Sequence, residues 1–309
     1  MCYHEQFHRG ESMSRRRKNR VRRIRRRIRV ICIMLGLVFL LWISKTLIRD
    51  TNYDKSNEHT SIIESEESVH QQSETNISDV DDTNPEEDPI INKLNTFARN
   101  HQFSVNEYPS ELVELLLKNP DTEEFVLNYP LKKNTFSKEK LTELEEDKIP
   151  LLMQWDSRWG YYKYGDNVMG LTGCGPTCLS MVASYLLQNP ALTPIYMAEY
   201  ATRNGYSVSG SGTSWNFMSE GATELGLHVK EVPLMENKIK NYLQQGYPII
   251  CILGPGEFTD NGHFIVLTGV EDDKIRLNDP NSRERSERMW EYEELKNQIR
   301  NIWVYQVDY

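Results

Sequence analysis

The sequence is poor in cysteine, in histidine and in long hydrophobic runs. Its 309 residues include 5 Cys and 7 His, and so few cysteines exclude a small fold held together by several disulfides. Hydrophobic residues make up 39% and charged residues 26% of the chain, which excludes a membrane protein with many spans. The length allows one domain of ordinary size with additional segments, or two small domains.

The formal net charge of -9 hides two regions of opposite sign. Residues 1–29 contain 12 Arg and Lys against two acids, whereas residues 51–90 contain twelve Asp and Glu. A segment so acidic and so poor in aromatic residues cannot bury enough apolar surface to fold, so residues 49–89 are predicted to be a disordered linker.

One apolar segment follows the basic tail at residues 1–29. Residues 30–48, with Lys45 snorkelling to the membrane surface, would span about 28 Å as a helix, and we predict a transmembrane helix there. Basic residues before it and acidic residues after it favour a cytoplasmic N-terminus and an extracellular C-terminal domain. A cleaved signal peptide is the alternative, but no small-residue cleavage site follows. The basic tail is interpreted as a contact to the membrane, with no nucleic acid as partner.

Residues 90–148 are predicted to form a small helical brace and a linker. Residues 110–118 and 121–129 carry helical patterns, and Asp121 with Glu124 has the spacing of a capping box for the second helix. The charged residues 131–148 indicate a linker. Nothing in this region points to chemistry.

Residues 149–309 have the sequence pattern of a globular domain in which helices precede strands. Helices are predicted at 175–187, 193–205, 214–225 and 236–245, and strands at 248–253, 264–268, 274–278 and 302–307. Helical segments followed by antiparallel strands predict an α+β fold.

Cys174 has the most reactive setting of the cysteines. It lies between Gly173 and Gly175, directly before a predicted helix, and these glycines would let a substrate backbone approach the sulfur. The helix N-terminus favours the thiolate. The alternative is a buried structural cysteine, which is our interpretation of Cys178 and Cys251. A Cys174–Cys178 zinc site lacks a second pair of ligands, so no metal and no cofactor are expected.

A histidine and a carboxylate complete a candidate triad. His263 follows Gly262 at the start of a predicted strand, whereas His228 is interpreted as a structural residue on a strand edge. A turn between the strands at 264–268 and 274–278 would return Asp279 beside His263, where it could orient the imidazole. Asn278 is the neighbouring alternative.

Gln154 lies twenty residues before Cys174. An amide beside a catalytic cysteine can donate a hydrogen bond to a developing oxyanion, together with the backbone N–H of the nucleophile. The surrounding aromatic residues are interpreted as packing rather than as a sugar site; they are Trp155, Trp159, Tyr161, Tyr162 and Tyr164.

Four elements in this order resemble those of the C39-like cysteine peptidase family. They are Gln154, the 173–177 segment GCGPT, the 262–264 segment GHF and the 278–280 segment NDP. The likeness covers residues 149–309, and the 212–215 and 279–283 segments look like those of membrane-anchored members from Gram-positive bacteria. The resemblance implies a papain-like fold with Cys174 as nucleophile, His263 as base and acid, Asp279 as its orienting partner and Gln154 as oxyanion donor. Processing members of the family are fused to a transporter and face the cytoplasm, and this chain is expected to differ in both respects.

The sequence therefore predicts a cell-surface cysteine peptidase or amide hydrolase, anchored by one helix, that acts on a peptide, isopeptide or cell-wall peptide bond. A catalytically silent peptide-binding module of the same fold is the alternative. A structural anchor, in which the linker and brace engage a partner, is a third possibility, and transpeptidation is as compatible with the residues as hydrolysis. The sequence is silent on the oligomeric state.

Overall fold

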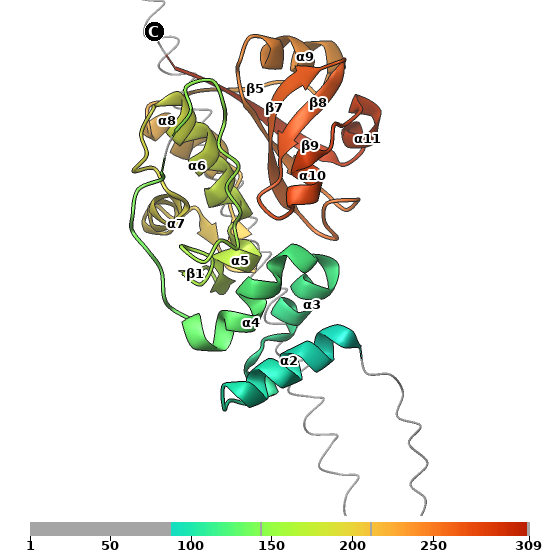
Figure 1. Cartoon of the computed structure of the whole chain (residues 1–309). Coiled ribbons are helices and arrows are strands. Elements are labelled where there is room, and N and C mark those ends of the chain that lie inside the picture. The colour runs from blue at the N-terminus through green and yellow to red at the C-terminus, as the bar shows by residue number, and fades with distance from the viewer. Residues whose placement is uncertain (1–87, 143, 211, 308–309) are drawn as a thin grey trace, which may run out of the picture. The chain divides into compact units, whose positions relative to one another are not determined.

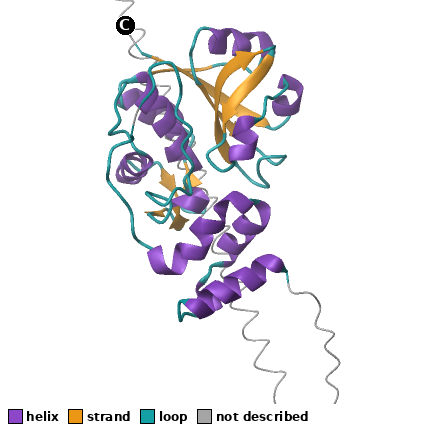
Figure 2. Ribbon diagram, viewed as in Figure 1, coloured by secondary structure: helices purple, strands orange, loops and turns teal. Residues whose placement is uncertain are grey.

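The computed structural model describes residues 88–142, 144–210 and 212–307. Most helices precede residue 225, and all strands of the main sheet follow it. In Figure 1, helices α6 and α7 lie on one side of the C-terminal part of the fold and the main sheet lies on the other. Figure 2 shows the same division between helix and strand. The mixed helix-and-sheet class predicted from the sequence is confirmed.

The main sheet has five antiparallel strands in the order β5-β9-β6-β7-β8. They are β5 (His228–Glu231), β6 (Ile249–Leu253), β7 (His263–Glu271), β8 (Lys274–Asn278) and β9 (Ile299–Gln306). Two short ribbons precede the sheet: β1 (Lys163–Tyr164) with β2 (Asn167–Val168), and β3 (Ser207–Val208) with β4 (Gly212–Thr213). The four strands predicted from residue 248 onward are present, and β7 and β9 are longer than predicted.

The helices predicted at 110–118, 121–129, 175–187, 193–205 and 236–245 are present with similar bounds, whereas four of the observed helices were not predicted. The observed helices are α2 (Pro89–Asn100), α3 (Ser110–Lys118), α4 (Glu123–Lys132), α5 (Met169–Thr172), α6 (Cys174–Leu186), α7 (Pro194–Arg203), α8 (Ala222–Glu224), α9 (Glu236–Gln244), α10 (Arg283–Glu287) and α11 (Tyr292–Lys296), with 3₁₀ turns at Val105–Glu107 and Pro120–Thr122. The helix predicted at 214–225 is shorter and irregular, because a π turn (Phe217–Gly221) precedes α8.

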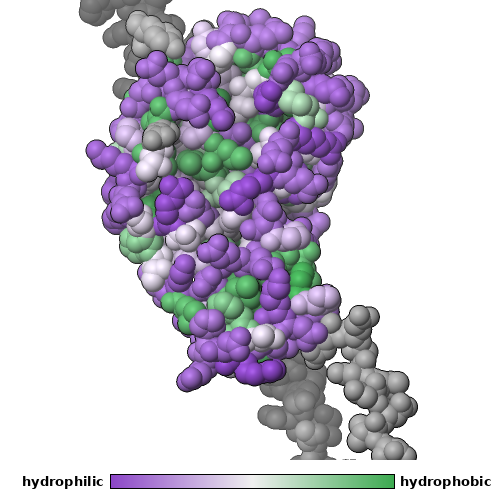
Figure 3. Space-filling model, in the orientation of Figure 1, coloured by the Kyte–Doolittle hydropathy of each residue, from purple (hydrophilic) through white to green (hydrophobic). Residues whose placement is uncertain are grey.

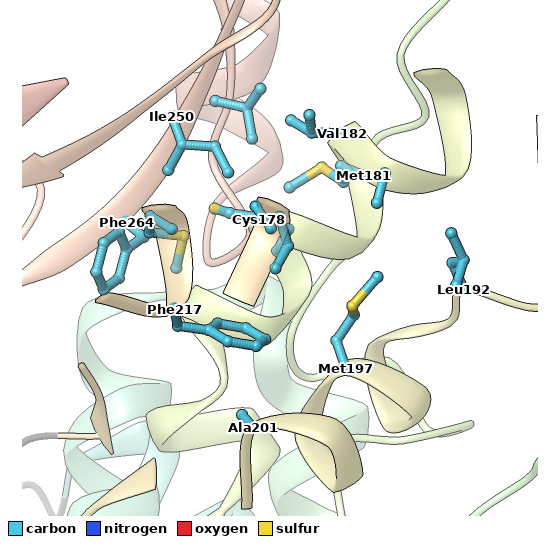
Figure 4. Close-up of a cluster of buried hydrophobic side chains, with 14 of the residues drawn as sticks. Cys178, Met181, Val182, Leu192, Met197, Ala201, Phe217, Ile250 and Phe264 are labelled. Atoms are coloured by element: carbon cyan, nitrogen blue, oxygen red, sulfur yellow. The ribbon is translucent and has the colours of Figure 1, made fainter. Parts of the chain in front are cut away.

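Both faces of the sheet are buried. Successive residues of a strand point to opposite faces, and β6 is buried at all five positions. Ile250 and Ile252 face the cluster formed with α6 and α7, whereas Ile249, Cys251 and Leu253 face the cluster formed with α9 and α11. Figure 4 shows the first cluster, in which Cys178 and Met181 of α6 lie near Ile250. The continuous apolar run of this strand is thereby explained.

Helix α6 is buried almost all round. Every residue from 175 to 184 is buried, so burial is not confined to one face of the helix. The helix contacts β7 of the sheet and also α7. A helix enclosed on several sides needs small or apolar residues over most of its surface, and the N-terminus of this helix is thereby held in a fixed position.

The helical brace, α2 to α4, packs directly on the rest of the fold. Its residues Leu112, Leu116 and Phe125 share one hydrophobic cluster with Trp155 and Tyr161. The Tyr161 hydroxyl also donates to the Phe125 carbonyl at 2.9 Å. The brace is therefore joined to the Gln154 region by apolar contacts and by hydrogen bonds.

Two details of the brace differ from the sequence prediction. Helix α2 was not predicted, although Asp88 accepts the N–H of Ile90 and Pro89 occupies the first turn, a recognised start signal. The capping box of Asp121 with Glu124 is wrong. Asn119 accepts the N–H of Asp121 instead, because a 3₁₀ turn separates Asn119 from α4.

The predicted basic tail, transmembrane helix (30–48) and acidic linker lie outside the described residues. Among the residues that are described, no helix is both long enough and apolar enough to span a bilayer.

Candidate active site

Cys174 is the first residue of α6 and is partly exposed. The backbone N–H groups of Gly175 and Phe264 hydrogen-bond to its sulfur. The flanking glycines have a packing role that the sequence did not reveal. A Cβ on Gly175 would lie 2.6 Å from Thr213 Oγ1, and one on Gly173 would lie 2.5 Å from the Met169 carbonyl oxygen. Glycine is therefore required here by the protein's own neighbours.

His263 joins the thiol to a carboxylate. It begins β7 opposite Leu253 of β6 and is buried. Its Nε2 donates to Asp279 Oδ1 at 2.7 Å, and its side chain also hydrogen-bonds to Cys174. Since Nε2 faces the carboxylate, Nδ1 is the nitrogen on the side of the thiol.

Asp279 directly follows β8 and is fully buried. Its Oδ1 also accepts the Asn281 N–H at 2.8 Å, and its Oδ2 accepts Arg285 Nε–H at 2.6 Å. The predicted return of the β7–β8 hairpin brings Asp279, not Asn278, to the histidine. Asn278 instead donates its amide to the carbonyl oxygens of Ile149 and Pro150.

The charges of these three groups favour a thiolate–imidazolium pair. Burial lowers the pKa of His263, but Asp279 and Cys174 raise it more strongly, to about 10. Burial raises the pKa of Cys174, but the His263 hydrogen bond and charge, with the two backbone N–H groups, lower it below its usual value. Burial likewise raises the pKa of Asp279, and His263 and Arg285 bring it below the usual range. Each shift follows from a neighbouring opposite charge.

Gln154 is buried close to the turn that carries Asp279. Its backbone N–H donates to the Pro280 carbonyl at 2.7 Å, and its side-chain Nε2 donates to the Gly170 carbonyl at 2.8 Å. That bond uses one of the two amide hydrogens. Its Oε1 is buried without a hydrogen bond to the described residues.

Arg285 is the member of this network that sequence reasoning missed. It lies in the short helix α10, where Ser282 caps the first turn by accepting the Arg285 N–H. Its guanidinium reaches Asp279 across six residues, and no helix was predicted there. An Asp-Pro turn followed by a Ser cap was the available signal.

The other candidates are structural. Cys178 and Cys251 are fully buried, and burial raises the pKa of both thiols. Trp155, Trp159 and Tyr161 are also buried, which agrees with the packing interpretation for these three residues, whereas Tyr164 is buried but also lines the cavity beside Cys174. Within the part of the chain that the structure covers, no group of three His, Cys, Asp or Glu could hold a metal ion.

A cavity of about 710 Å³ opens beside Cys174. Its volume lies in the range of binding pockets for small molecules or a few residues of peptide. Figure 3 shows hydrophobic surface on the face turned to the viewer, between the helical side and the sheet. The cavity mixes apolar and polar residues; they are Tyr164, Asp166, Asn167, Leu171, Thr172, Cys174, Val208, Gly210, Gly212, Thr213, Trp215, Ile252, Asn261, Gly262 and Phe264.

Comparison with known proteins gives a family and several solved structures. The family model described as the Peptidase_C39 like family matches residues 146–309. A search of curated proteins gave no match.

Three solved structures are similar to the chain. The peptidase domain of Streptococcus ComA, a bifunctional ABC transporter involved in a quorum-sensing pathway, is 19% identical over 44% of this chain and 93% of that chain, with a TM-score of 0.35. A double-glycine-motif protease from an AMS/PCAT transporter, in complex with a leader peptide, is 22% identical over 53% and 94%, with a TM-score of 0.36. A Bacillus anthracis protein described as a C39-like peptidase is 14% identical over 52% and 96%, with a TM-score of 0.34.

The family model agrees with the resemblance carried by Gln154, the 173–177 segment, the 262–264 segment and the 278–280 segment. Since its match spans more than half of the chain, the protein belongs to the Peptidase_C39-like family.

Proposed function

We propose that this protein is a cell-surface cysteine peptidase or amide hydrolase of papain-like fold, with a Cys174–His263–Asp279 triad and Gln154 as oxyanion donor. The observation that carries the proposal is the hydrogen-bonded series from Cys174 through His263 to Asp279. A nucleophile bonded to a base that is oriented by a third group is the arrangement of covalent catalysis.

In acylation, the Cys174 thiolate attacks the carbonyl carbon of an amide and forms a C–S bond. The Cys174 backbone N–H and the second amide hydrogen of Gln154 donate to the oxyanion that develops. The His263 imidazolium then gives its Nδ1 proton to the leaving nitrogen as the C–N bond breaks. The products are a free amine and a thioester on Cys174.

In deacylation, the now neutral His263 removes a proton from water, and the oxygen attacks the thioester carbonyl. The C–S bond breaks, and a carboxylic acid and the thiolate–imidazolium pair are regenerated. Asp279 keeps Nε2 protonated throughout, so that Nδ1 is the nitrogen that exchanges protons. An amine in place of water would give transpeptidation by the same steps.

The proposed substrate is a peptide or isopeptide bond, and cell-wall peptides fit a domain outside the membrane. The basic tail and the apolar residues 30–48 support the surface location, with residues 1–29 in the cytoplasm. Carbonate extraction of membranes and protease protection of intact cells would test both statements. Release of the chain by carbonate would contradict the anchor.

Site-resolved alkylation of the full chain with iodoacetamide tests the chemistry. Mass spectrometry follows the peptide that contains Cys174 in the wild type and in His263→Ala, with Cys174→Ala confirming the assignment. We expect Cys174 to react rapidly at about pH 6 in the wild type and slowly in His263→Ala. Labelling no faster than that of a free cysteine, whose pKa is about 8.5, and indifferent to His263 would contradict the triad.

A further inference from the structure

The helical brace touches the site at the turn that carries Asp279. We propose that Asn119, at the end of α3, is a positioning residue that holds this turn and, through it, the catalytic carboxylate. The inference rests on the proposed triad, but Asn119 and the rest of the brace lie outside residues 146–309, which the family model matches.

Asn119 is buried and is itself held in place. Its side-chain Oδ1 accepts the Asp121 N–H at 3.2 Å, and its own carbonyl accepts the Thr122 hydroxyl at 2.7 Å. Its side-chain NH₂ donates to the carbonyl oxygen of Asn281. A short, buried amide that is fixed at both ends is well suited to set the position of a backbone group.

Asn281 connects this bond to the triad. Its N–H donates to Asp279 Oδ1, the oxygen that also accepts His263 Nε2–H. Its carbonyl accepts a second donor, Trp155 Nε1–H, at 3.1 Å. Two side chains, one from the brace and one beside Gln154, therefore hold the residue that lines up the carboxylate.

The brace also reaches the segment that holds Gln154. Phe125 of α4 packs so closely on Gly160 and Gly170 that a Cβ on either glycine would overlap its ring. The Gly170 carbonyl is the acceptor of the Gln154 side chain. A second brace contact therefore supports the backbone on which the proposed oxyanion donor depends.

The ion pair between Lys118 and Asp260 is not part of the proposal. Both side chains are largely exposed, at 66% and 79%, and such pairs contribute little. Lys118→Met, at the same end of α3, is therefore a control for an effect of charge near the site.

Asn119→Ser tests the proposal in the full chain. Serine keeps the cap on the Asp121 N–H, since it is a good N-cap residue, but is too short to reach the Asn281 carbonyl. Loss of one hydrogen bond should weaken the hold on Asp279. The thiolate–imidazolium pair is then less stable, and the pKa of Cys174 rises. We expect alkylation of Cys174 at about pH 6 to slow roughly 2- to 12-fold, and the midpoint of its pH profile to move upward.

Tyr108→Phe is the matched control. It removes a hydrogen bond inside the brace, from the Tyr108 hydroxyl to the Leu127 carbonyl, that has no link to the triad. It should lower the melting temperature without changing the pH profile of alkylation. Trp155→Phe removes the other donor to the Asn281 carbonyl. It should act in the same direction as Asn119→Ser, and it decides the question if Asn119→Ser does not fold.

The outcomes separate this inference from the proposed function. A wild-type chain without a fast-reacting Cys174 contradicts the triad itself. A fast wild-type reaction that Asn119→Ser leaves unchanged, or that Tyr108→Phe slows equally, overturns the positioning role and leaves the triad standing.

Discussion

Helix α6 carries two cysteines on successive turns, and the pKa values of their thiols shift in opposite directions. Cys174 is the first residue of the helix, and Cys178 lies one turn further along it. Burial raises the pKa of the Cys174 thiol, but the hydrogen bond and charge of His263, together with the backbone N–H groups of Phe264 and Gly175, lower it below its usual value. At Cys178, burial is the largest cause of the pKa shift, and the neighbouring Cys174, Asp279 and Cys251 add to it. The pKa of this thiol is therefore raised well above its usual value.

The comparison shows that position decides the chemistry of these thiols. Cys178 lies in the hydrophobic cluster of Figure 4, among Met181, Ile250 and Phe264. Cys174 is half-buried beside the cavity and meets backbone N–H groups as well as an imidazole. A cysteine is activated where a helix end and a cation coincide, and it is inert where apolar residues surround it.

Replacing each of these two cysteines by alanine is expected to give the largest difference between the two positions. Cys174→Ala should abolish the rapid alkylation with little loss of stability, because the residue is partly exposed. Cys178→Ala should leave rapid alkylation of Cys174 intact and lower the free energy of unfolding by about 1 kcal/mol, because it leaves space in a packed core. Alkylation kinetics and urea denaturation measure the two effects. The comparison fails if Cys178→Ala abolishes alkylation at Cys174.

Asp279→Asn should make the thiol of Cys174 behave more like the buried thiol of Cys178. Without the carboxylate charge, burial lowers the pKa of His263 from about 10, and the pKa of Cys174 rises because its cationic partner is lost at lower pH. Alkylation of Cys174 at about pH 6 should fall at least about tenfold, which corresponds to one pKa unit.

Asp273→Asn is the control for that substitution. Asp273 lies in the turn between β7 and β8, pairs with Lys240 and is 84% exposed. Its variant should alkylate like the wild type. Equal slowing in both variants would show that the hairpin, and not the buried charge at its base, controls the thiol.

Local rules explain why the arrangement of Cys174, His263 and Asp279 could be predicted. Cys174 begins a helix with proline in its first turn, and the β7–β8 hairpin returns the chain over a short distance to bring Asp279 beside His263. Both inferences use neighbours in sequence or a single tight turn. The apolar run of β6 likewise predicts a strand buried on both faces.

Contacts between distant segments could not be predicted in the same way. The need for Gly175 comes from Thr213, which a separate ribbon brings against the start of α6. Arg285 reaches Asp279 from a five-residue helix whose formation depends on packing. The link from Asn119 to Asn281 joins residues 162 positions apart. Single-sequence patterns carry no information about such pairs.

Arg285→Gln sharpens the account of the buried carboxylate. Burial raises the pKa of Asp279, while His263 and Arg285 lower it further than burial raises it. A carboxylate with a lowered pKa in the folded state contributes stability that is present above its unfolded pKa of about 3.9 and is lost as the pH falls through the folded value. Without Arg285 the pKa of Asp279 is lowered less, so the contribution at neutral pH is smaller by about 1.5–3 kcal/mol, the range of a hydrogen bond to a charged group.

The difference in unfolding free energy between wild type and Arg285→Gln should therefore be largest at about pH 7 and smaller at about pH 3, because part of this contribution is lost once the pH falls below the unfolded pKa of about 3.9. Urea denaturation at the two pH values measures it. Arg283→Gln is the matched control, because that guanidinium lies over the Trp155 ring, 4.4 Å from its centroid, and makes no hydrogen bond to Asp279 among the described contacts. Its effect should not change with pH. A difference for Arg285→Gln that is equally independent of pH would mean that the arginine acts by packing, against Phe258 for example, and that His263 alone keeps Asp279 ionised.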